Sequence, residues 1–234
     1  MKFVIEPKVF ETLKDVCFTV VVALNIDNTK DLPEIESLLN ENIKKCETHF
    51  ESTKVKESKE VSYYREAFRE MDINPNKFMS SIEALLTRIS KKKGMPSINP
   101  IVNLGNAVSL KYRIPIGAHD LDSSNEDFYV RYSKPGDTFI PFGETEMEPV
   151  DNNEIVYATG NSVRTRRWIW RQSELGKITE YTKNVMFPMD GFIGNKEQLL
   201  LAQKELADLL KKHFDCDVQV DWIDVENQEF EFEV

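Results

Sequence analysis

The sequence predicts an α+β protein in which mainly antiparallel sheets pack against helices, and three observations support this fold class. Apolar residues recur at helical spacing over residues 33–50, 80–90 and 99–112. Residues 115–187 instead contain short alternating runs separated by Pro, Gly and Asn turns, which is typical of antiparallel strands. The Val-rich run over residues 16–26 suits a strand that is buried on both faces.

Local signals mark the ends of several elements. Ser80 with Glu83 three residues later predicts a capping box, and Asn99 followed by Pro100 predicts a second helix start. Gly105, inside that second helix, predicts a close approach by another backbone or by a ligand. We expect further helices over residues 61–71 and 195–214, and strands over residues 128–132, 138–142, 155–158, 163–170, 178–187, 218–222 and 230–234. No repeat or low-complexity linker interrupts residues 1–234, so we expect a single domain.

Composition and charge restrict the classes of function. The 234 residues carry 30 Lys and Arg against 40 Asp and Glu, a net charge of -10. Proteins that bind nucleic acid by bulk electrostatics normally have the opposite sign, so any such contact must be a local basic patch. The longest apolar run, residues 17–24, is too short for a membrane span, and no basic segment precedes it as in a signal peptide. We expect Cys17, Cys46 and Cys216 to be buried free thiols in a reducing, cytoplasmic environment.

Conventional catalytic and metal-binding signatures are missing. The sequence contains no G-x-S-x-G, Walker loop, dinucleotide glycine fingerprint or H-E-x-x-H motif. No Cys or His pair has ligand spacing, so we expect neither a metal site nor a cofactor.

The segment 163–172 is dense in arginine and tryptophan. Strand alternation would place Arg164, Arg166, Trp168 and Trp170 on one face. Guanidinium groups bind phosphates or carboxylates, and indole rings stack on bases, so this face is a candidate binding surface. An equally good interpretation is a sheet face packed in the core, because tryptophan is usually buried.

A second candidate segment, PIGAHDLD over residues 115–122, brings His119 and Asp120 together in a polar turn. Such a pair can polarise water, but neighbouring side chains of an extended chain point to opposite sides. Asp120 as a turn or cap residue and His119 as a satisfied histidine therefore remain alternatives. Asn103 and Asn106, on the preceding helix, could line the same cavity.

The order of several motifs resembles a known family. These motifs are SSIEALLTRI (residues 80–89), INPIVNLGNAVSLKYRIPIGAHDLD (98–122) and TKNVMF (182–187). They resemble the B3/B4 domain of the bacterial phenylalanyl-tRNA synthetase beta subunit, the editing module that hydrolyses tyrosine mischarged onto the phenylalanine tRNA. RRWIWRQS (166–173) and YREAFRE (64–70) resemble the stand-alone B3/B4 proteins. The resemblance covers roughly residues 60–193 and implies a layered B3/B4-type fold.

The resemblance also implies that the editing pocket is rebuilt. Where the synthetase pattern has a pocket threonine, asparagine and histidine, this chain has Gly105, Asn106 and Gly117. An aspartate of the pattern is replaced by Asn103, and a phenylalanine is replaced by His119. We therefore expect the fold, but not the tyrosine specificity, to carry over.

Three further parts of the chain can be compared with the synthetase pattern. A pocket glutamate aligns with Pro188, which leaves Asp190 as the nearest acid, whereas the aspartate of the second motif is kept as Asp120. The small, Gly-rich wall of the synthetase pocket falls where this chain has residues 168–172.

Hydrolysis of an aminoacyl ester requires a positioned water and donors near the developing oxyanion, and the terminal ribose hydroxyl of the tRNA can assist. We expect catalytic roles for Asn106, His119 and Arg171. The residues that we expect to bind substrate are Asn103, Gly105, Gly117, Asp120, Arg166, Trp168, Trp170 and Gln172.

Our first functional hypothesis is a trans-acting aminoacyl-tRNA deacylase that binds the aminoacylated acceptor end of a tRNA. A non-catalytic module that binds tRNA or an aminoacylated ligand is the second, and a small-molecule binder for an amino acid or nucleotide is the third. We expect neither a DNA nor a membrane partner, and no complete tRNA ligase, because no ATP-binding catalytic domain is recognisable. All three hypotheses need a cavity between the helix with Asn103 and Asn106 and the segment 163–172.

Overall fold

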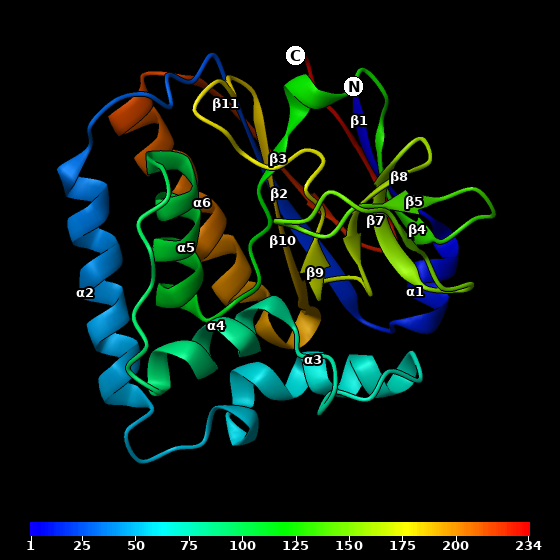
Figure 1. Ribbon diagram of the computed structural model, residues 1–234, viewed down its shortest axis with the longest axis horizontal. Helices are drawn as coiled ribbons and strands as arrows, with labels where there is room; N and C mark the ends of the chain where they lie inside the picture. Colours follow the sequence, from blue (N-terminus) through cyan, green and yellow to red (C-terminus); the bar gives the residue numbers. More distant parts are fainter.

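The computed structural model describes residues 1–234, which form two sheets and six α-helices (Figure 1). The helices are α1 (Pro7–Thr12), α2 (Pro33–His49), α3 (Lys59–Glu70), α4 (Ser81–Ser90), α5 (Pro100–Tyr112) and α6 (Lys196–Phe214). The smaller sheet has the order β11 (Asp217–Ile223), β2 (Val16–Leu24), β10 (Val185–Phe192) and β3 (His119–Asp120).

The larger sheet has the order β12 (Glu229–Glu231), β1 (Lys2–Ile5), β4 (Phe128–Tyr132), β7 (Ile155–Thr159), β8 (Ser162–Arg166), β5 (Thr138–Phe139) and β6 (Glu148–Pro149), with β9 (Arg171–Gln172) paired to β8. Only the β1–β4 and β5–β8 pairs are parallel. This arrangement confirms the α+β fold class with mainly antiparallel sheets.

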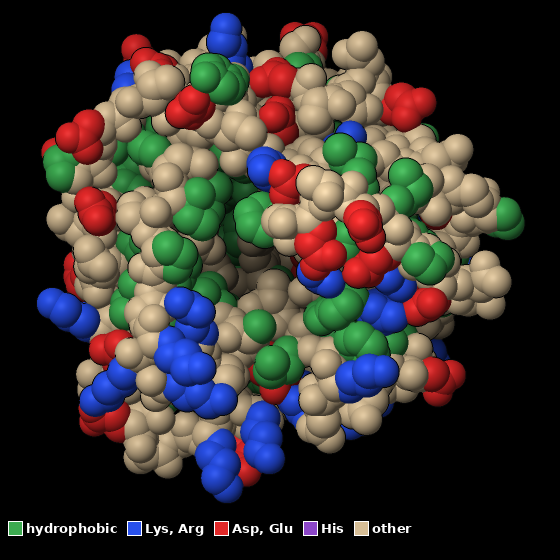
Figure 2. Space-filling model, viewed as in Figure 1, with side chains coloured by type: hydrophobic (Ala, Val, Ile, Leu, Met, Phe, Trp, Pro, Cys, Tyr) green, Lys and Arg blue, Asp and Glu red, His purple; other side chains and the backbone are tan.

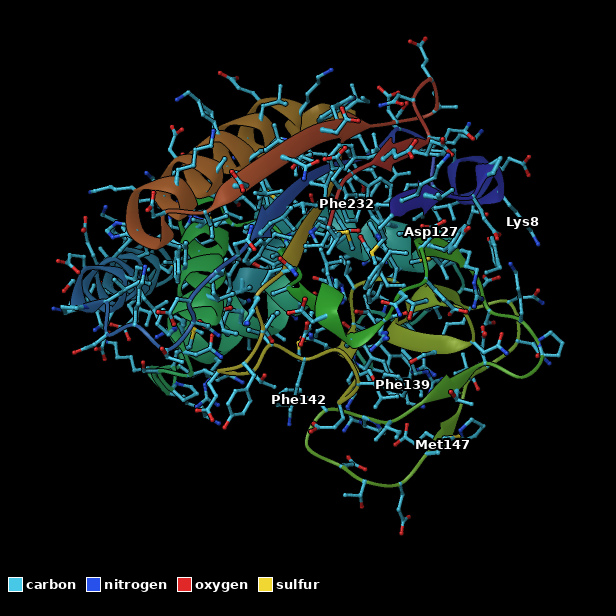
Figure 3. All side chains as sticks on the ribbon, turned by 90° about the horizontal axis from the view of Figure 1, so that it is seen from above. Lys8, Asp127, Phe139, Phe142, Met147 and Phe232 are labelled. Atoms are coloured by element: carbon cyan, nitrogen blue, oxygen red, sulfur yellow. The ribbon has the colours of Figure 1, made fainter.

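The two sheets and the helices form layers. In Figure 1, α2, α5 and α6 lie on one side of the molecule, and the larger sheet lies on the other side, with α3 and α4 below both. Helix α6 packs on β2, β10 and β11. In Figure 3 the loop that carries Phe142 and Met147 projects from the side of the molecule opposite α6. No helix is both long enough and apolar enough to cross a membrane.

Strand β2 lies at the centre of the core. All nine of its residues are buried, as the sequence predicted. Successive side chains enter different apolar clusters: Phe18 and Val20 pack with residues of the larger sheet and of α3 and α4, whereas Cys17 and Val21 pack with residues of α5 and α6. The strand is therefore covered on both faces, which explains its continuous apolar sequence.

Among the strands expected from residue 128 onward, four differ in the structure by more than one residue at an end. The strands expected over 138–142 and 230–234 are shorter, at Thr138–Phe139 and Glu229–Glu231. The strand expected over residues 163–170 ends at Arg166, because Arg167 and Trp168 adopt left-handed conformations with φ of 46° and 59°. The Glu154 carboxylate stabilises this turn by accepting hydrogen bonds from the Arg167 N–H and the Arg166 Nε. The strand expected over 178–187 begins at Val185 and continues to Phe192.

Two local predictions on helices α4 and α5 have definite outcomes. Ser80 caps α4 by accepting from the Glu83 N–H, but the Glu83 side chain forms an ion pair with Arg65 at 2.6 Å, so the reciprocal half of the capping box is absent. The expected close approach at Gly105 is present: the Phe187 ring lies 3.4 Å from the position that a Cβ would take. A ring side chain, rather than another backbone, makes this contact.

Candidate functional site

Two adjoining cavities lie between α5, β9, β10 and the segment 115–119. The outer chamber, of about 380 Å³, has Gly105, Asn106, Phe142 and Lys177 in its wall. The inner chamber, of about 90 Å³, is lined by side chains that include His119, Tyr157, Trp168, Trp170, Pro188 and Asp190. Ile116, Gly117 and Gln172 belong to both walls, so the chambers form one cleft. Figure 2 shows a hollow in this region, between α5 and the strands.

Asp190 is the ionisable group at the centre of the inner chamber. Its side chain is 2% exposed, and its Oδ1 accepts hydrogen bonds from the Tyr157 hydroxyl and the Trp168 Nε1, both at 2.6 Å. Its Oδ2 has no partner within the protein, so this oxygen is available to a water or ligand in the chamber. Burial raises the pKa of Asp190 to about 7, and the two hydrogen bonds oppose that shift only in part.

The local backbone explains how these groups meet. Along β10, Pro188 and Asp190 are two residues apart and share the face that lines the inner chamber. The left-handed turn at Arg167 and Trp168 redirects the Trp168 side chain, so that its indole reaches Asp190. Two consecutive left-handed residues without glycine are costly, and such conformations are concentrated at functional sites.

His119 lies on β3 with its ring against Tyr157, at 5.6 Å between ring centroids and 21° between ring planes. The side chain is buried, and its Nδ1 has no hydrogen-bond partner. Burial lowers the pKa of His119 to about 3, with a smaller contribution from Arg164. The imidazole is therefore neutral near pH 7 and suited to hydrogen bonding rather than to carrying a proton.

Four other expected site residues line the cleft. Gly105 and Asn106 come from α5, and the Asn106 side chain forms no hydrogen bond within the protein. Gln172 donates from Nε2 to the Ala118 carbonyl at 3.0 Å, which holds β9 against the segment 115–119. At Gly117 a Cβ would lie 3.2 Å from Pro188 Cγ and 3.3 Å from His119 Nε2, so glycine keeps this part of the cleft open.

Trp168 and Trp170 combine the two roles that the sequence left open. Trp168 is fully buried in the core and also lines the inner chamber. Trp170 lines the same chamber and packs edge-to-face on Phe78, with 4.9 Å between ring centroids. The Arg167 guanidinium lies over the Trp170 ring at 4.6 Å.

The structure places all four arginines of this segment outside the cleft walls, which corrects the expected shared face of arginine and indole side chains. Arg164 is buried and donates from Nε and Nη2 to the Thr159 hydroxyl at 3.1 and 3.0 Å. Arg166 is buried in ion pairs with Glu154 at 2.9 Å and Asp151 at 3.2 Å. Arg171 pairs with Glu144 at 2.7 Å near the surface. The strand alternation that would have aligned Arg164 and Arg166 with the tryptophans ends at Arg166, where the turn begins.

Asn103 and Asp120 also lie outside the cleft walls and have structural partners. The Asn103 side chain is buried, accepts from the Ile98 N–H at 3.0 Å and donates to Ser97 Oγ at 2.8 Å. The Asp120 carboxylate accepts from the Asp122 N–H and from the Thr182 hydroxyl, both at 2.8 Å. Asp120 therefore takes the turn role that was weighed for it, and Asn103 fixes the segment before α5.

Asp190 and Tyr157 were not among the residues expected to bind substrate or to act in catalysis, although the resemblance marked Asp190 as the acid nearest to the position of a pocket glutamate. The sequence did contain a signal for Asp190, because it is the single charged residue in the apolar strand VMFPMDGF. A lone acid in such a strand is buried, and a buried acid requires partners. Tyr157 gave no such signal, since a tyrosine in a sheet strand is common.

Comparison with known proteins gives the following similarities. A model of the B3/4 domain matches residues 63–219. The phenylalanine–tRNA ligase beta subunit of Idiomarina loihiensis is 28% identical over 114 residues, which are 47% of this chain and 14% of that protein. The crystal structure of an N-terminal fragment of the phenylalanyl-tRNA synthetase beta-subunit from Pyrococcus horikoshii has a TM-score of 0.46 and 13% identity, covering 92% of this chain and 49% of that one.

The chain thus spans only a small part of the ligase subunit that it resembles in sequence. The domain match extends from within α3 through α6 into β11 and includes every element that lines the cleft. Because this match covers most of the sequence, the chain belongs to the B3/4 domain family.

Proposed function

We propose that the protein binds the aminoacylated end of a tRNA and hydrolyses the aminoacyl ester in the cleft, acting in trans. The observation that carries this proposal is the buried Asp190 carboxylate, which has one oxygen free in the inner chamber and a pKa near neutrality. A general base is most effective when its pKa lies close to the working pH. Similarity to a phenylalanine–tRNA ligase subunit supports an aminoacylated tRNA as the substrate class.

The proposed reaction uses the residues of the cleft as follows. Asp190 Oδ2 accepts a proton from a water molecule as the water oxygen attacks the ester carbonyl. The bond to the ribose oxygen then breaks, and that oxygen takes up the proton, which leaves a free amino acid and an uncharged tRNA end. Tyr157 and Trp168 hold Asp190 Oδ1 so that Oδ2 keeps its direction toward the chamber. Asn106, which has no protein partner, is placed to hydrogen-bond a ribose hydroxyl or the carbonyl oxygen.

The sizes of the chambers support a division of the substrate between them. The inner chamber, at about 90 Å³, has room for a few water molecules or a short side chain. The outer chamber, at about 380 Å³, is larger and carries the exposed Phe142 ring as a stacking platform for a base. We infer the cytoplasm as the compartment, because Cys17, Cys46 and Cys216 are all free.

A panel of mischarged tRNAs tests the proposal. We expect the wild type to accelerate the loss of one or a few amino acids, with a rate that rises with pH and levels off above about pH 7. Asp190→Asn should lower the rate by about 10²- to 10⁴-fold, and Asn106→Ala should lower it less. Asp208→Asn, on the exposed face of α6, is the matched control and should leave the rate unchanged.

Two other results would contradict ester hydrolysis. Binding of tRNA without ester loss across the whole panel would identify a binding module instead. Absence of tRNA binding, together with thermal stabilisation by an amino acid or nucleotide, would identify a small-molecule binder.

A further inference from the structure

We propose that a basic patch at the C-terminal end of α4 binds the phosphate backbone of the RNA whose end enters the cleft. The patch consists of Lys54, Lys56, Arg88, Lys91, Lys92 and Lys93. This inference rests on the proposed function, because it assumes that an RNA end occupies the cleft. It adds a second contact region, separate from the chambers, and assigns it to a polyanion.

The charges of the patch are only weakly compensated. All six cations are exposed, and two acids lie among them. Lys54 pairs with Glu57 at 3.3 Å and Lys92 with Glu51 at 3.9 Å, whereas Lys56, Lys91 and Lys93 form no ion pair. The patch therefore has a net charge of about +4 on a chain whose net charge is -10. Figure 2 shows Lys and Arg side chains gathered below the central hollow on this face.

Helix stability explains part of this pattern but not all of it. Cations are favourable at a helix C-terminus, where the carbonyl groups carry partial negative charge. Arg88 lies in the last turn of α4, where its charge has this role, and its Nε donates to the Gly94 carbonyl beyond the helix end at 2.7 Å. Lys54 and Lys56, however, belong to a different segment around the 3₁₀ helix Val55–Glu57, and they have no part in ending α4.

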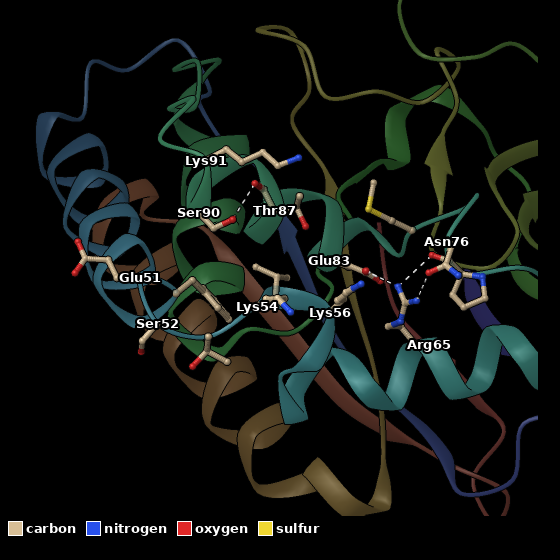
Figure 4. Close-up of a pocket in the computed structure, with 15 residues that line it drawn as sticks. Glu51, Ser52, Lys54, Lys56, Arg65, Asn76, Glu83, Thr87, Ser90 and Lys91 are labelled. Carbon is tan, nitrogen blue, oxygen red and sulfur yellow. Dashed lines mark hydrogen bonds and ion pairs between the residues drawn. The ribbon is translucent and has the colours of Figure 1, made fainter.

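These two segments meet in one polar cavity of about 480 Å³, shown in Figure 4. Lys54, Lys56 and Lys91 line it together with the hydroxyl-bearing residues Thr87 and Ser90. In Figure 4 the Lys91 side chain extends along one edge of the pocket, and Lys54 and Lys56 lie across from it. Ammonium and hydroxyl groups are common phosphate donors, so the pocket suits a phosphodiester.

At the far end of this pocket lies the ion pair of Arg65 and Glu83. The Arg65 guanidinium also donates to Asn76 Oδ1 at 2.6 Å, as the dashed lines in Figure 4 indicate. The pair carries no net charge, but Glu51 also lines the pocket, so three lysines and Arg65 stand against Glu51 and Glu83 and the lining has a net charge of about +2.

The backbone connects the patch to the cleft in two ways. Helix α4 begins at Ser81, in the wall of the inner chamber, and ends one residue before Lys91, a length of about 15 Å. The segment that follows Lys93 reaches Ile98, in the wall of the outer chamber, and Asn103 fixes this segment through its two hydrogen bonds. At a rise of about 3.4 Å per nucleotide, the distance corresponds to roughly four nucleotides.

This continuity favours a nucleic acid over an acidic protein as the partner. A single occupant that reaches both the patch and the cleft must combine repeated negative charge with an end small enough for the chambers. A tRNA acceptor arm has both properties. The negative charge of the rest of the surface would then keep the RNA from binding elsewhere on the molecule.

The test compares Lys91→Gln/Lys92→Gln/Lys93→Gln with a control, Lys14→Gln/Lys211→Gln/Lys212→Gln. The control removes the same charge from exposed lysines, one before β2 and two at the end of α6, that form no ion pair. Binding of uncharged tRNA is measured between about 50 and 200 mM salt. Each variant's hydrolysis of a full-length aminoacyl-tRNA and of an aminoacyl ester of adenosine is measured in parallel.

For the patch variant we expect the slope of log affinity against log salt to become shallower by about 3, roughly one for each lost phosphate contact. We expect KM for the aminoacyl-tRNA to rise at least about tenfold at low salt, with hydrolysis of the adenosine ester unchanged. The control should behave as the wild type in both assays. Equal thermal stability of the two variants separates a binding effect from misfolding.

An unchanged salt slope and KM in the patch variant would overturn the patch while leaving ester hydrolysis intact. Equal losses in both variants would also overturn it, since bulk charge would then account for binding. A wild type that binds no tRNA and hydrolyses neither substrate would overturn the proposed function, and the patch assignment with it. Competition by polyglutamate but not by RNA would assign the patch to an acidic protein instead.

Discussion

Replacing Asp190 with asparagine should stabilise the folded protein at alkaline pH and at the same time lower the rate of ester hydrolysis by about 10²- to 10⁴-fold. The amide oxygen of the substituted side chain can still accept from Tyr157 and Trp168, so the hydrogen bonds made by Oδ1 remain possible. The variant removes the negative charge from a side chain that is 2% exposed. If the carboxylate only stabilised the fold, its removal would lower the free energy of unfolding. If it is a buried charge with a raised pKa, its removal should increase the free energy of unfolding at alkaline pH.

The magnitude follows from proton linkage. Burial raises the folded-state pKa of Asp190 to about 7 from 3.8, so wild-type stability falls as the pH rises through this interval and is constant above it. Each pKa unit corresponds to about 1.4 kcal/mol. Two pH units separate pH 5 from the folded-state pKa. The free energy of unfolding of the variant, relative to that of the wild type, should therefore be about 2.7 kcal/mol higher at pH 8.5 than at pH 5.

Urea unfolding of both proteins at pH 5 and at pH 8.5 gives this difference. Because every other titrating group is common to both proteins, the double difference isolates Asp190. If Asp190→Asn changes the free energy of unfolding by the same amount at pH 5 and at pH 8.5, the folded-state pKa of Asp190 is not raised. The reasoning for Asp190 as general base would then fail, whatever the kinetics of the variant.

Three further substitutions test other parts of the structure. His119→Gln should make the protein more resistant to acid, because the pKa of the wild-type imidazole is lowered to about 3 and the folded wild type therefore loses stability as the pH falls below about 6.5. Circular dichroism from pH 7 to pH 3 measures the unfolding of both proteins, and parallel curves would contradict this prediction. Gly117→Ala should narrow the cleft and lower kcat/KM about tenfold to a hundredfold with a thermal shift of only a few degrees, and a full rate would show that the passage is unused. Arg166→Met should cost about 3–5 kcal/mol in urea unfolding because it leaves Glu154 buried without its partner, and Glu154→Gln in the same chain should restore part of that loss.

The regular elements were largely predictable from the sequence because their signals are local. The helix starts at Ser80 and Asn99 follow from cap chemistry, and the central strand over residues 16–24 follows from an unbroken apolar run. The strand at 128–132 has the expected bounds. The first strand and helix, Lys2–Ile5 and Pro7–Thr12, were missed because four and six residues carry too little periodicity to be recognised.

The site was less predictable because its geometry depends on long-range pairings. Period-two alternation placed Arg166 beside Trp168, and only the Glu154 carboxylate, 13 residues earlier than Arg167, explains the turn that separates them. Asp190 becomes central only when Tyr157 and Trp168, from other strands and turns, meet it. Gly117 and Asn106 were recognisable because the family pattern marks their positions.

The central position of β2 has a consequence for the synthesis of the chain. This strand, VCFTVVVAL, is made early, but both of its partners, β10 and β11, follow more than 150 residues later. At about 5–20 residues per second, the strand would wait on the order of 10–30 s for its partners. An uncharged β-branched run of this kind is prone to self-association while it is unpaired. Newly made protein should therefore depend on chaperones during translation, whereas the folded protein should show its slowest amide exchange in this same strand.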